Sequence, residues 1–265
     1  MTGLPGDYHV HTTFSDGDGT VAQCVARAAE LGLAEIGIAD HGAPVAPAGW
    51  ESECLSPERL DPYVSAVRRE AERQDRLVVL LGLEAEYIAG EEARLAEFLA
   101  AASFDYVVAG IHVIDGFEFD EPGLRDDARW DDVDSLSRDY YRTVRGAAQC
   151  GLFDVIAHFD YIGLWGHRPS AVVDPDIDAA LDAIAASGAA LELNTDRIGD
   201  PAGVMYPSPD ILRRARRRDI PLIISSDAHA ADHVGRLWGE AIGMARAAGY
   251  TETLRLSDRA LVPLP

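Results

Sequence analysis

Residues 7–17 read Asp-Tyr-His-Val-His-Thr-Thr-Phe-Ser-Asp-Gly, and this stretch separates two candidate folds. Its first six residues have the pattern of a short buried strand that carries histidines toward its end. A dinucleotide-binding sheet would need a GxGxxG turn after its first strand, and that turn is absent. A parallel barrel instead places functional side chains at the carboxyl ends of many strands, so His9 and His11 favour a barrel.

A short apolar strand followed by a helical stretch recurs seven times along the chain. Strands are predicted at residues 7–12, 35–40, 77–86, 106–113, 153–158, 190–194 and 222–226. Helices are predicted near residues 20–31, 57–74, 91–102, 133–149, 175–187, 208–218 and 233–248. This alternation indicates parallel strands covered by helices, and we expect one α/β domain over residues 1–265.

The composition narrows the possible chemistry. A formal net charge of −22 argues against passive binding of extended nucleic acid, which needs a basic surface. All 23 basic side chains are arginine, so a P-loop lysine, Schiff-base chemistry and a carbamylated-lysine metal bridge are excluded. No apolar run approaches the roughly 18 residues of a membrane span. Residues 1–7 lack a signal-peptide pattern, and we expect a cytoplasmic protein.

The histidines gather at one end of the predicted sheet. Six of the eight histidines lie within or just after a predicted strand, and these six are His9, His11, His41, His112, His158 and His229. His9 and His11 are two residues apart on a strand, so both side chains face the same way. Packing alone gives no reason to collect imidazoles at one rim. The sequence therefore predicts a metal cluster that would suit Zn²⁺, Mn²⁺ or Fe²⁺.

Carboxylates at the same rim complete the candidate donor set. Asp227 stands two residues before His229 at a strand end, which favours a ligand role. Glu84 and Glu86 both point inward on a regular strand, so that one could bridge two metals while the other supports a ligand. The turn after the first strand would bring Asp16 back over His9 and His11. Asp40 alternates to the other face and is expected to support neighbouring groups.

A run of acidic residues extends from Asp115 to Asp134. We interpret it as a solvated loop followed by a helix start. Its aromatic residues, Phe117, Phe119 and Trp130, could help to shape a substrate pocket.

The sequence resembles the PHP (polymerase and histidinol phosphatase) family. The resemblance rests on an ordered set of motifs from residue 7 to about residue 235. These motifs are His9-Val-His11-Thr-Thr-Phe-Ser-Asp16-Gly, Ala39-Asp-His41, Gly82-Leu-Glu84, Gly110-Ile-His112, Ala157-His158-Phe-Asp160, Leu191-Glu-Leu-Asn194-Thr195 and Ser226-Asp227-Ala-His229. Length and the fifth and sixth motifs are most similar to the stand-alone histidinol-phosphate phosphatases of that family.

The resemblance implies a distorted (β/α)₇ barrel with three divalent metal ions at the carboxyl ends of its strands. One metal would take His9, His11, Glu84 and Asp227. A second would share Glu84 and add His112 and His158. A third would take Asp16, His41 and His229. The resemblance also implies a phosphatase that acts on a small phosphate monoester, with L-histidinol phosphate, an intermediate of histidine biosynthesis, as the expected substrate.

In the mechanism that we expect, a hydroxide bridging two metals attacks phosphorus. Arginine would bind the phosphate, because its planar fork suits bidentate contact. Arg197 is the first candidate, Arg168 is the second, and His233 could contact the substrate. Asp227, His229 or metal-bound water could protonate the leaving group.

Other classes of protein fit parts of the pattern. A nuclease or nucleotide phosphoesterase would use the same metals, although the negative charge counts against long nucleic acids. A metal-dependent amidohydrolase would also accept the donor set, but the order of the motifs disfavours it. A non-catalytic metal-binding protein is disfavoured by the complete set of ligands. The sequence leaves the oligomeric state open.

Overall fold

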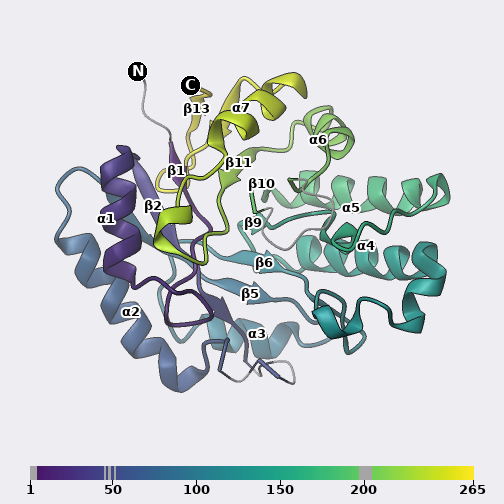
Figure 1. The fold of residues 1–265 in the computed structure, drawn as a ribbon, viewed down its shortest axis with the longest axis horizontal. Coiled ribbons are helices and arrows are strands. Elements are labelled where there is room, and N and C mark those ends of the chain that lie inside the picture. Colours follow the sequence, from purple (N-terminus) through teal and green to yellow (C-terminus); the bar gives the residue numbers. More distant parts are fainter. Residues whose placement is uncertain (1–4, 45, 47–48, 51, 197–204) are drawn as a thin grey trace.

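The protein folds as a parallel α/β barrel in a computed structural model that describes residues 5–44, 46, 49–50, 52–196 and 205–265. The barrel strands pair in parallel throughout, with Glu35 opposite Val78 and Leu191 opposite Leu222 as examples of the register. They are β1 Gly6–Asp7, β2 Glu35–Ile38, β3 His41–Gly42, β4 Val78–Leu81, β5 Glu84–Glu86, β6 Val108–Gly110, β9 Val155–Ile156, β10 Ala190–Asn194 and β11 Leu222–Ser225. Figure 1 shows these strands grouped in the middle of the molecule.

Hydrogen bonds close the two parallel sheets, of order β1-β2-β4 and β11-β10-β9-β6-β5-β3, into one ring. The chain crosses from one sheet to the other between β2 and β3 and between β4 and β5. On the other side, the His11 backbone N–H donates to the Ala228 carbonyl at 2.9 Å, and the Ala228 N–H donates to the His9 carbonyl at 3.2 Å. The predicted distorted (β/α)₇ barrel is therefore confirmed, with seven strand positions, two of them interrupted.

A buried tyrosine explains why two glycines occur in the strands. A Cβ added at Gly37 or at Gly82 would overlap the ring of Tyr106, which lies inside the barrel. The Tyr106 hydroxyl donates to the Tyr8 carbonyl at 2.6 Å. Tyr63, from a covering helix, places its hydroxyl within 2.8 Å of the carbonyls of Ile38 and Gly82, where both strands are interrupted. The interruption is thus built around aromatic side chains.

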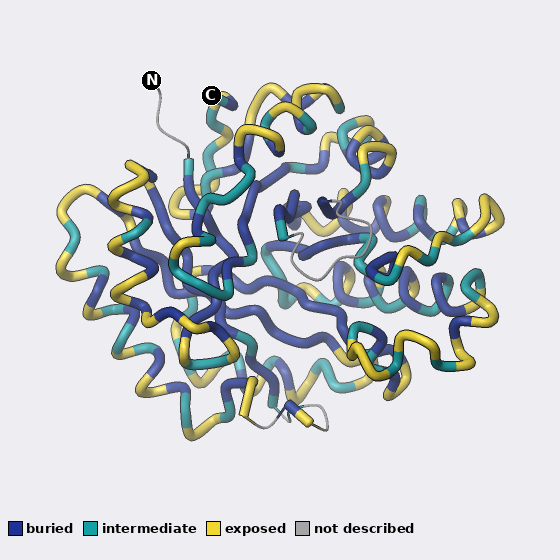
Figure 2. Tube along the Cα trace, viewed as in Figure 1, coloured by how far each residue is buried: buried dark blue, intermediate teal, exposed yellow. Residues whose placement is uncertain are grey.

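Helices cover the outside of the barrel, and their exposed faces alternate with buried ones in Figure 2. They are α1 Val21–Leu31, α2 Pro57–Glu72, α3 Glu92–Leu99, α4 Val133–Cys150, α5 Asp174–Ser187, α6 Pro209–Arg216 and α7 Trp238–Ala247. Thr20 and Gln23 form a capping box at the start of α1, which satisfies the first free N–H groups of that helix. None of the helices in the described ranges has the length and apolar character to cross a membrane.

Three local features differ from the sequence-based prediction. A hairpin forms from β7 Val113–Ile114 and β8 Phe117–Glu118, inside a stretch interpreted as a solvated loop. A second hairpin forms from β12 Glu252–Leu254 and β13 Leu261–Pro263, and Leu254 packs in the barrel interior. The last helix begins at Trp238 rather than at residue 233, because residues 231–233 form a separate 3₁₀ turn.

Candidate metal centre

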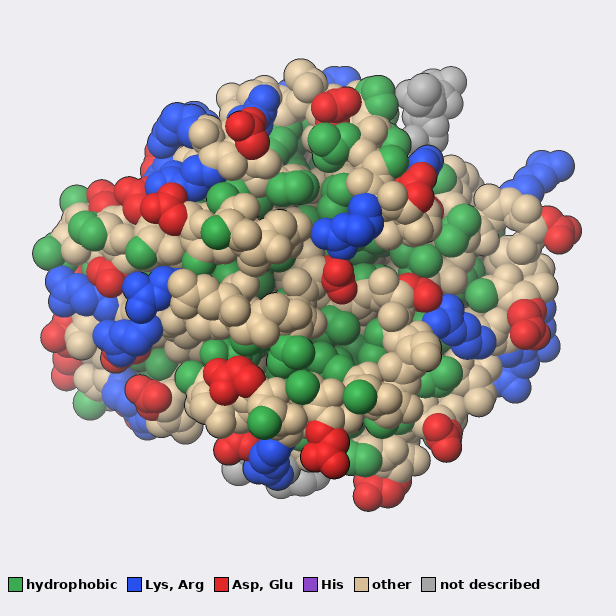
Figure 3. Space-filling view, turned by 180° about the vertical axis from the view of Figure 1, so that it is seen from behind, with side chains coloured by type: hydrophobic (Ala, Val, Ile, Leu, Met, Phe, Trp, Pro, Cys, Tyr) green, Lys and Arg blue, Asp and Glu red, His purple; other side chains and the backbone are tan. Residues whose placement is uncertain are grey.

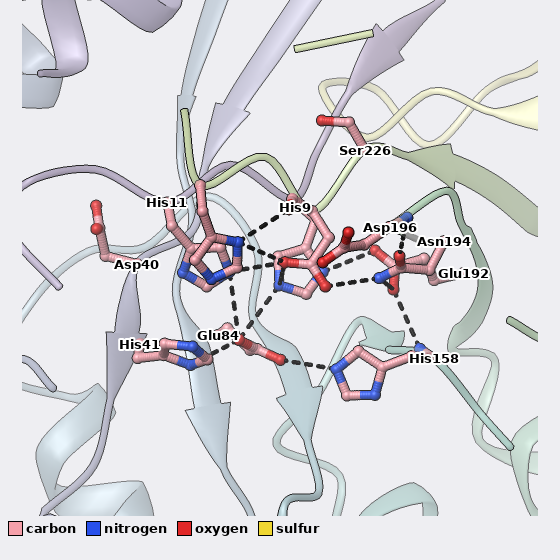
Figure 4. A network of polar contacts seen from close by, with 12 residues as sticks. His9, His11, Asp40, His41, Glu84, His158, Glu192, Asn194, Asp196 and Ser226 are labelled. Atoms are coloured by element: carbon pink, nitrogen blue, oxygen red, sulfur yellow. Dashed lines mark hydrogen bonds and ion pairs between the residues drawn. The ribbon is translucent and has the colours of Figure 1, made fainter. Parts of the chain in front are cut away.

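The carboxyl ends of the strands bring imidazole and carboxylate groups together at one rim of the barrel. His9 and His11 follow β1, His41 lies on β3 and Glu84 lies on β5. Further along the chain, the residues at the same rim are His112, His158, Asp227 and His229. Figure 4 shows Glu84 below His9 and His11, with His41 on one side and His158 on the other. Parallel strands end at a common rim, which is why residues distant in sequence meet here.

A first group of potential ligand atoms is buried and makes no hydrogen bond of regular geometry among the described residues. These atoms are His9 Nε2, His11 Nε2, Glu84 Oε2 and Asp227 Oδ1. His9 Nε2 lies 3.2 Å from Glu84 Oε2, and His11 Nε2 lies 3.1 Å from Asp227 Oδ1. Two imidazole nitrogens and two carboxylate oxygens at such spacing suit a cation in tetrahedral coordination. The ligand atoms of such a cation lie about 2.0–2.2 Å from the metal. The residues present therefore fit a divalent metal.

Glu84 also takes part in a second group. Its Oε1 lies 3.2 Å from His158 Nε2 and 3.8 Å from His112 Nε2. A Cβ added at Gly110 would lie 2.7 Å from Glu84 Oε1, so a larger residue there would require this carboxylate to shift. The two oxygens of Glu84 face different groups of histidines, which is the geometry of a bridging carboxylate.

A third group lies at the more exposed side of the rim. His11, Asp16, His41 and His229 offer ligand atoms that all lie within 4.8 Å of one another. His229 Nε2 is 3.0 Å from Asp16 Oδ2, and His41 Nε2 is 3.8 Å from the same oxygen. The turn after β1 thus brings Asp16 to the cluster. All nine residues expected from the sequence to bind metal lie within the three groups or directly beside them.

Carboxylates behind the cluster hold its histidines in place. Glu192, on β10, lies 2.8 Å from His9 Nδ1 and accepts a hydrogen bond from the His158 backbone N–H at 3.1 Å. Glu86 lies 2.7 Å from His112 Nδ1 and accepts from the His112 backbone N–H at 3.0 Å. A carboxylate on one ring nitrogen fixes the tautomer that leaves the other nitrogen free to bind metal.

Asp40 acts on the turn rather than on a histidine. Its carboxylate accepts hydrogen bonds from the backbone N–H groups of Thr12 and Ser15 and from both of their hydroxyls. These bonds fix the turn that carries Asp16. Asp227 and His158 have φ of 51° and 24°, a left-handed conformation that is uncommon for residues other than glycine and that often marks functional sites.

Charges in the cluster are arranged to receive a cation. Burial lowers the pKa of His11 to about 4, so this imidazole is neutral. Burial would raise the pKa of Glu84, but nearby imidazoles, His9 foremost, hold it well below its usual range. Burial would lower the pKa of His229, but the carboxylate of Asp16 outweighs it and raises the pKa to about 10. A bound cation would displace that proton.

The cluster forms the floor of a cavity of about 490 Å³. Two aromatic residues, Trp50 and Tyr161, and one arginine of the described chain, Arg236, also line it. Carboxylates outside the metal groups complete the lining, and they are Asp18, Glu53, Glu118, Asp120, Glu121 and Asp196.

The residues expected to contact substrate lie in different places. His233 lines the cavity. Arg168 lines a separate cavity and donates to the carbonyls of Gly163 and His167. Arg197 lies outside the described residues. Arg236 was not among the residues expected from the sequence, where it falls inside the helix predicted near residues 233–248.

The acidic run also differs from its interpretation as a solvated loop. Glu118, Asp120 and Glu121 line the cavity. In contrast, Phe117 and Phe119 are buried in the hydrophobic core that the covering helices share. The hairpin alternates its side chains, so the phenylalanines anchor it and the carboxylates face the site. An Asp-Gly pair at residues 115–116 between apolar residues is a hairpin signal that could have been recognised.

A parallel α/β barrel with a buried imidazole and carboxylate cluster at the carboxyl rim belongs to the class of barrel metalloenzymes. Within that class, a family model described as PHP domain matches residues 7–196, nearly three quarters of the chain. The chain belongs to the PHP domain family.

Relatives and solved structures agree with this assignment. The chain is similar to a Deinococcus radiodurans protein named "Probable histidinol-phosphatase", 36% identical over 96% of this chain and 98% of the relative. A Bacillus subtilis histidinol-phosphatase is 26% identical to this chain, over 86% of this chain and 95% of the relative. The fold matches the crystal structure of Lactococcus lactis histidinol phosphate phosphatase complexed with Zn, L-histidinol and phosphate, at a TM-score of 0.80 and 23% identity over 97% of this chain and 98% of that chain.

Proposed function

We propose that the protein is a metal-dependent phosphatase that hydrolyses L-histidinol phosphate to L-histidinol and phosphate. Membership of the PHP domain family and the Deinococcus radiodurans relative support the reaction. The observation that carries the proposal is a set of buried ligand atoms on His9, His11, Glu84 and Asp227 that make no hydrogen bond of regular geometry among the described residues. Such atoms are costly to bury unless a cation binds them.

The proposed ligands divide among three divalent cations. The first is assigned to His9, His11, Glu84 and Asp227. The second shares Glu84 and adds His112 and His158. The third is assigned to Asp16, His41 and His229. When bound, such cations lower the pKa of water and neutralise charge on a phosphoryl group. The mixed donor set is compatible with Zn²⁺, Mn²⁺ or Fe²⁺.

Two side chains of the cavity are suited to bind the phosphoryl oxygens. Arg236 is held by an ion pair with Asp196 and by hydrogen bonds to the Ser226 carbonyl. One of its N–H groups lies 3.4 Å from His233 Nδ1, which makes that nitrogen an acceptor and puts the ring proton of His233 on Nε2. Arg236 and His233 thus both offer N–H donors in the cavity. Arg197 remains a second arginine candidate.

The candidates for protonation of the leaving oxygen are Asp227, His229 and a water bound by the cations. The His229 side chain is 36% exposed, and its Nδ1 lies 3.7 Å from Asp227 Oδ1. It is therefore the cluster histidine with the best access to the cavity and to solvent. Asp227 receives a hydrogen bond from Asn194 at 2.9 Å, which fixes the carboxylate beside the imidazole.

Charge distribution favours a small substrate over a nucleic acid. The cavity lining contains many carboxylates and one described arginine. On the face shown in Figure 3, arginine side chains lie among Asp and Glu rather than in one continuous band. A nuclease would need such a band along the path of the backbone.

A substrate panel tests the proposal. Purified protein reconstituted with Zn²⁺, Mn²⁺ or Fe²⁺ would be assayed with L-histidinol phosphate, a nucleoside monophosphate, single-stranded DNA and a cyclic amide. We expect the highest kcat/KM with L-histidinol phosphate. A higher kcat/KM with any other member, or no phosphatase activity with any metal, would refute the proposal. Elemental analysis is expected to give three metals per chain.

A further inference from the structure

One wall of the cavity is acidic although its residues lie outside the proposed metal ligands. The β7–β8 hairpin and the three residues after it contribute Glu118, Asp120 and Glu121 to the lining. Bound cations would neutralise the carboxylates of the metal groups but not these three. A wall that remains negative attracts a substrate with a positively charged group.

Asp120 is the member of this wall with an unmet hydrogen bond. Its Oδ1 is buried, and no group in the described ranges donates to it. A carboxylate oxygen removed from water without a donor costs free energy that a bound donor recovers. Glu118, in contrast, already accepts a hydrogen bond from the indole N–H of Trp50.

The hairpin holds Asp120 at a fixed place relative to the metal ligands. Val113 pairs with Glu118, and the tight turn between them passes through Asp115 and Gly116, both with positive φ. The backbone N–H of Phe119 donates to the carbonyl of His112 at 3.2 Å, and the Phe119 side chain is fully buried. Asp120 therefore directly follows a residue that is hydrogen-bonded to His112. A substrate whose phosphate binds the cations and whose hydrogen-bond donor binds Asp120 would therefore need a fixed distance between these two groups.

An aromatic surface adjoins this wall. The ring of Trp50 lies 5.4 Å from the ring of His112 and 5.4 Å from that of His41. Trp50 is thus in contact both with proposed ligands and, through Glu118, with the hairpin. An aromatic face next to carboxylates is a favourable surface for an organic cation.

We propose that Asp120 determines specificity by binding the ammonium group of an amine-bearing phosphate monoester. The inference rests on the proposed function and names the group of the substrate that this part of the site recognises. In L-histidinol phosphate the amine is on the carbon next to the phosphate-bearing carbon. The wall that contains Asp120 can therefore bind the amine while the cations bind the phosphate.

The test compares two substrates that differ only in the amine. L-Histidinol phosphate and 3-(imidazol-4-yl)propyl phosphate would be assayed with the native protein and with Asp120→Asn. We expect Asp120→Asn to lower kcat/KM for the amine substrate about 10- to 100-fold, the range of a hydrogen bond to a charged group, mainly through KM. The value for the analogue without the amine should stay within about twofold. The Kd of L-histidinol, measured by calorimetry, should rise by the same factor.

Asp126→Asn is the matched control. Asp126 belongs to the same acidic run, is exposed and does not line the cavity, so the variant makes the same change of charge elsewhere. We expect no change with either substrate. Equal losses of Asp120→Asn on both substrates, or no loss on either, would overturn the inference.

Failure of the proposed function would give a different result. The native protein would then hydrolyse other monoesters but not L-histidinol phosphate. In that case the same two proteins would be compared with O-phosphoethanolamine and ethyl phosphate. Loss of a preference for the amine in Asp120→Asn would support the inference, and an unchanged preference would overturn it.

Discussion

The cavity joins two walls that are built in different ways. The metal wall consists of the nine proposed ligands. Eight lie at or just after the ends of barrel strands, and Asp16 lies in the turn after β1. The hairpin wall consists of residues 113–121, which pack against the barrel without belonging to it. Backbone pairing around the barrel fixes the first wall, whereas a short loop structure carries the second. The difference indicates that chemistry and specificity can change separately in this fold.

The strongest test of the metal wall is Glu84→Gln. Glu84 faces histidines on both sides, with His41 Nδ1 at 2.7 Å and His158 Nε2 at 3.2 Å. An amide cannot bridge two cations as a carboxylate does. We expect loss of metal by elemental analysis and a fall in kcat/KM of about 10³-fold or more, because bound metal contributes several kcal/mol to catalysis.

Glu53→Gln is the control for that variant. Glu53 is exposed and lines the rim of the cavity, so the change removes one carboxylate charge without touching the cluster. Its metal content should equal that of the native protein. Full metal content in Glu84→Gln would contradict the bridging role.

A smaller effect is expected from Glu192→Gln, behind the metal wall. Glu192 contacts His9 Nδ1 and the His158 backbone N–H but does not line the cavity. Loss of such a supporting carboxylate typically costs about 10- to 100-fold in metal affinity or activity. Metal titration against a chelator would measure it. The Kd of L-histidinol for the metal-loaded variant should be unchanged, since the hairpin wall is intact; a weakened Kd would show that the walls are not separate.

Gly82→Ala tests how tightly the metal wall depends on barrel packing. The added methyl group would overlap the Tyr106 ring, and overpacking of this kind costs about 1–3 kcal/mol. Thermal or denaturant unfolding would measure the loss. Gly243→Ala, at an exposed position of α7 where no described atom lies within 4 Å of the new Cβ, should instead gain up to about 1 kcal/mol. Equal stability of the two variants would contradict this packing account.

The smallest effect is a release of protons when metal binds. The pKa values of His229 and His112 are raised to about 10 by carboxylates, although burial opposes the shift. Both rings are therefore protonated at pH 7, and a cation must displace those protons. Apparent metal affinity should rise with pH and level off above about 10. Calorimetry of chelator-treated protein in buffers of different ionisation enthalpy would measure the release, and its absence would contradict the assignment of these ligands.

The metal wall was predictable from the sequence because its residues follow a simple rule. Parallel strands end at one rim, so His11 and His229 could be expected to meet although they are 218 positions apart in the sequence. The alternation of strands and helices predicted parallel strands covered by helices, and the missing GxGxxG turn together with the strand-end histidines favoured a barrel. The nine proposed ligands gather as expected, and their role as ligands stays a prediction.

The hairpin wall was not predicted, for physical reasons. Nine acidic residues between Asp115 and Asp134 resemble any solvated surface, and only the alternation with Phe117 and Phe119 distinguishes the part that faces inward. Arg236 was missed because a 3₁₀ turn at residues 231–233 is too short to interrupt a helical pattern visibly. Glu192 lies in a predicted strand, where a buried carboxylate is recognisable only from its partners.

Closure of the barrel between Ala228 and the residues after β1 has a consequence for how the protein is made. His9 leaves the ribosome more than 200 residues before Asp227, and their side chains meet only after the last barrel strand has been synthesised. A nascent chain that ends before Asp227 therefore cannot assemble the complete first metal group. High-affinity loading of that group with metal must then be a late event, and it marks chains that have completed the ring.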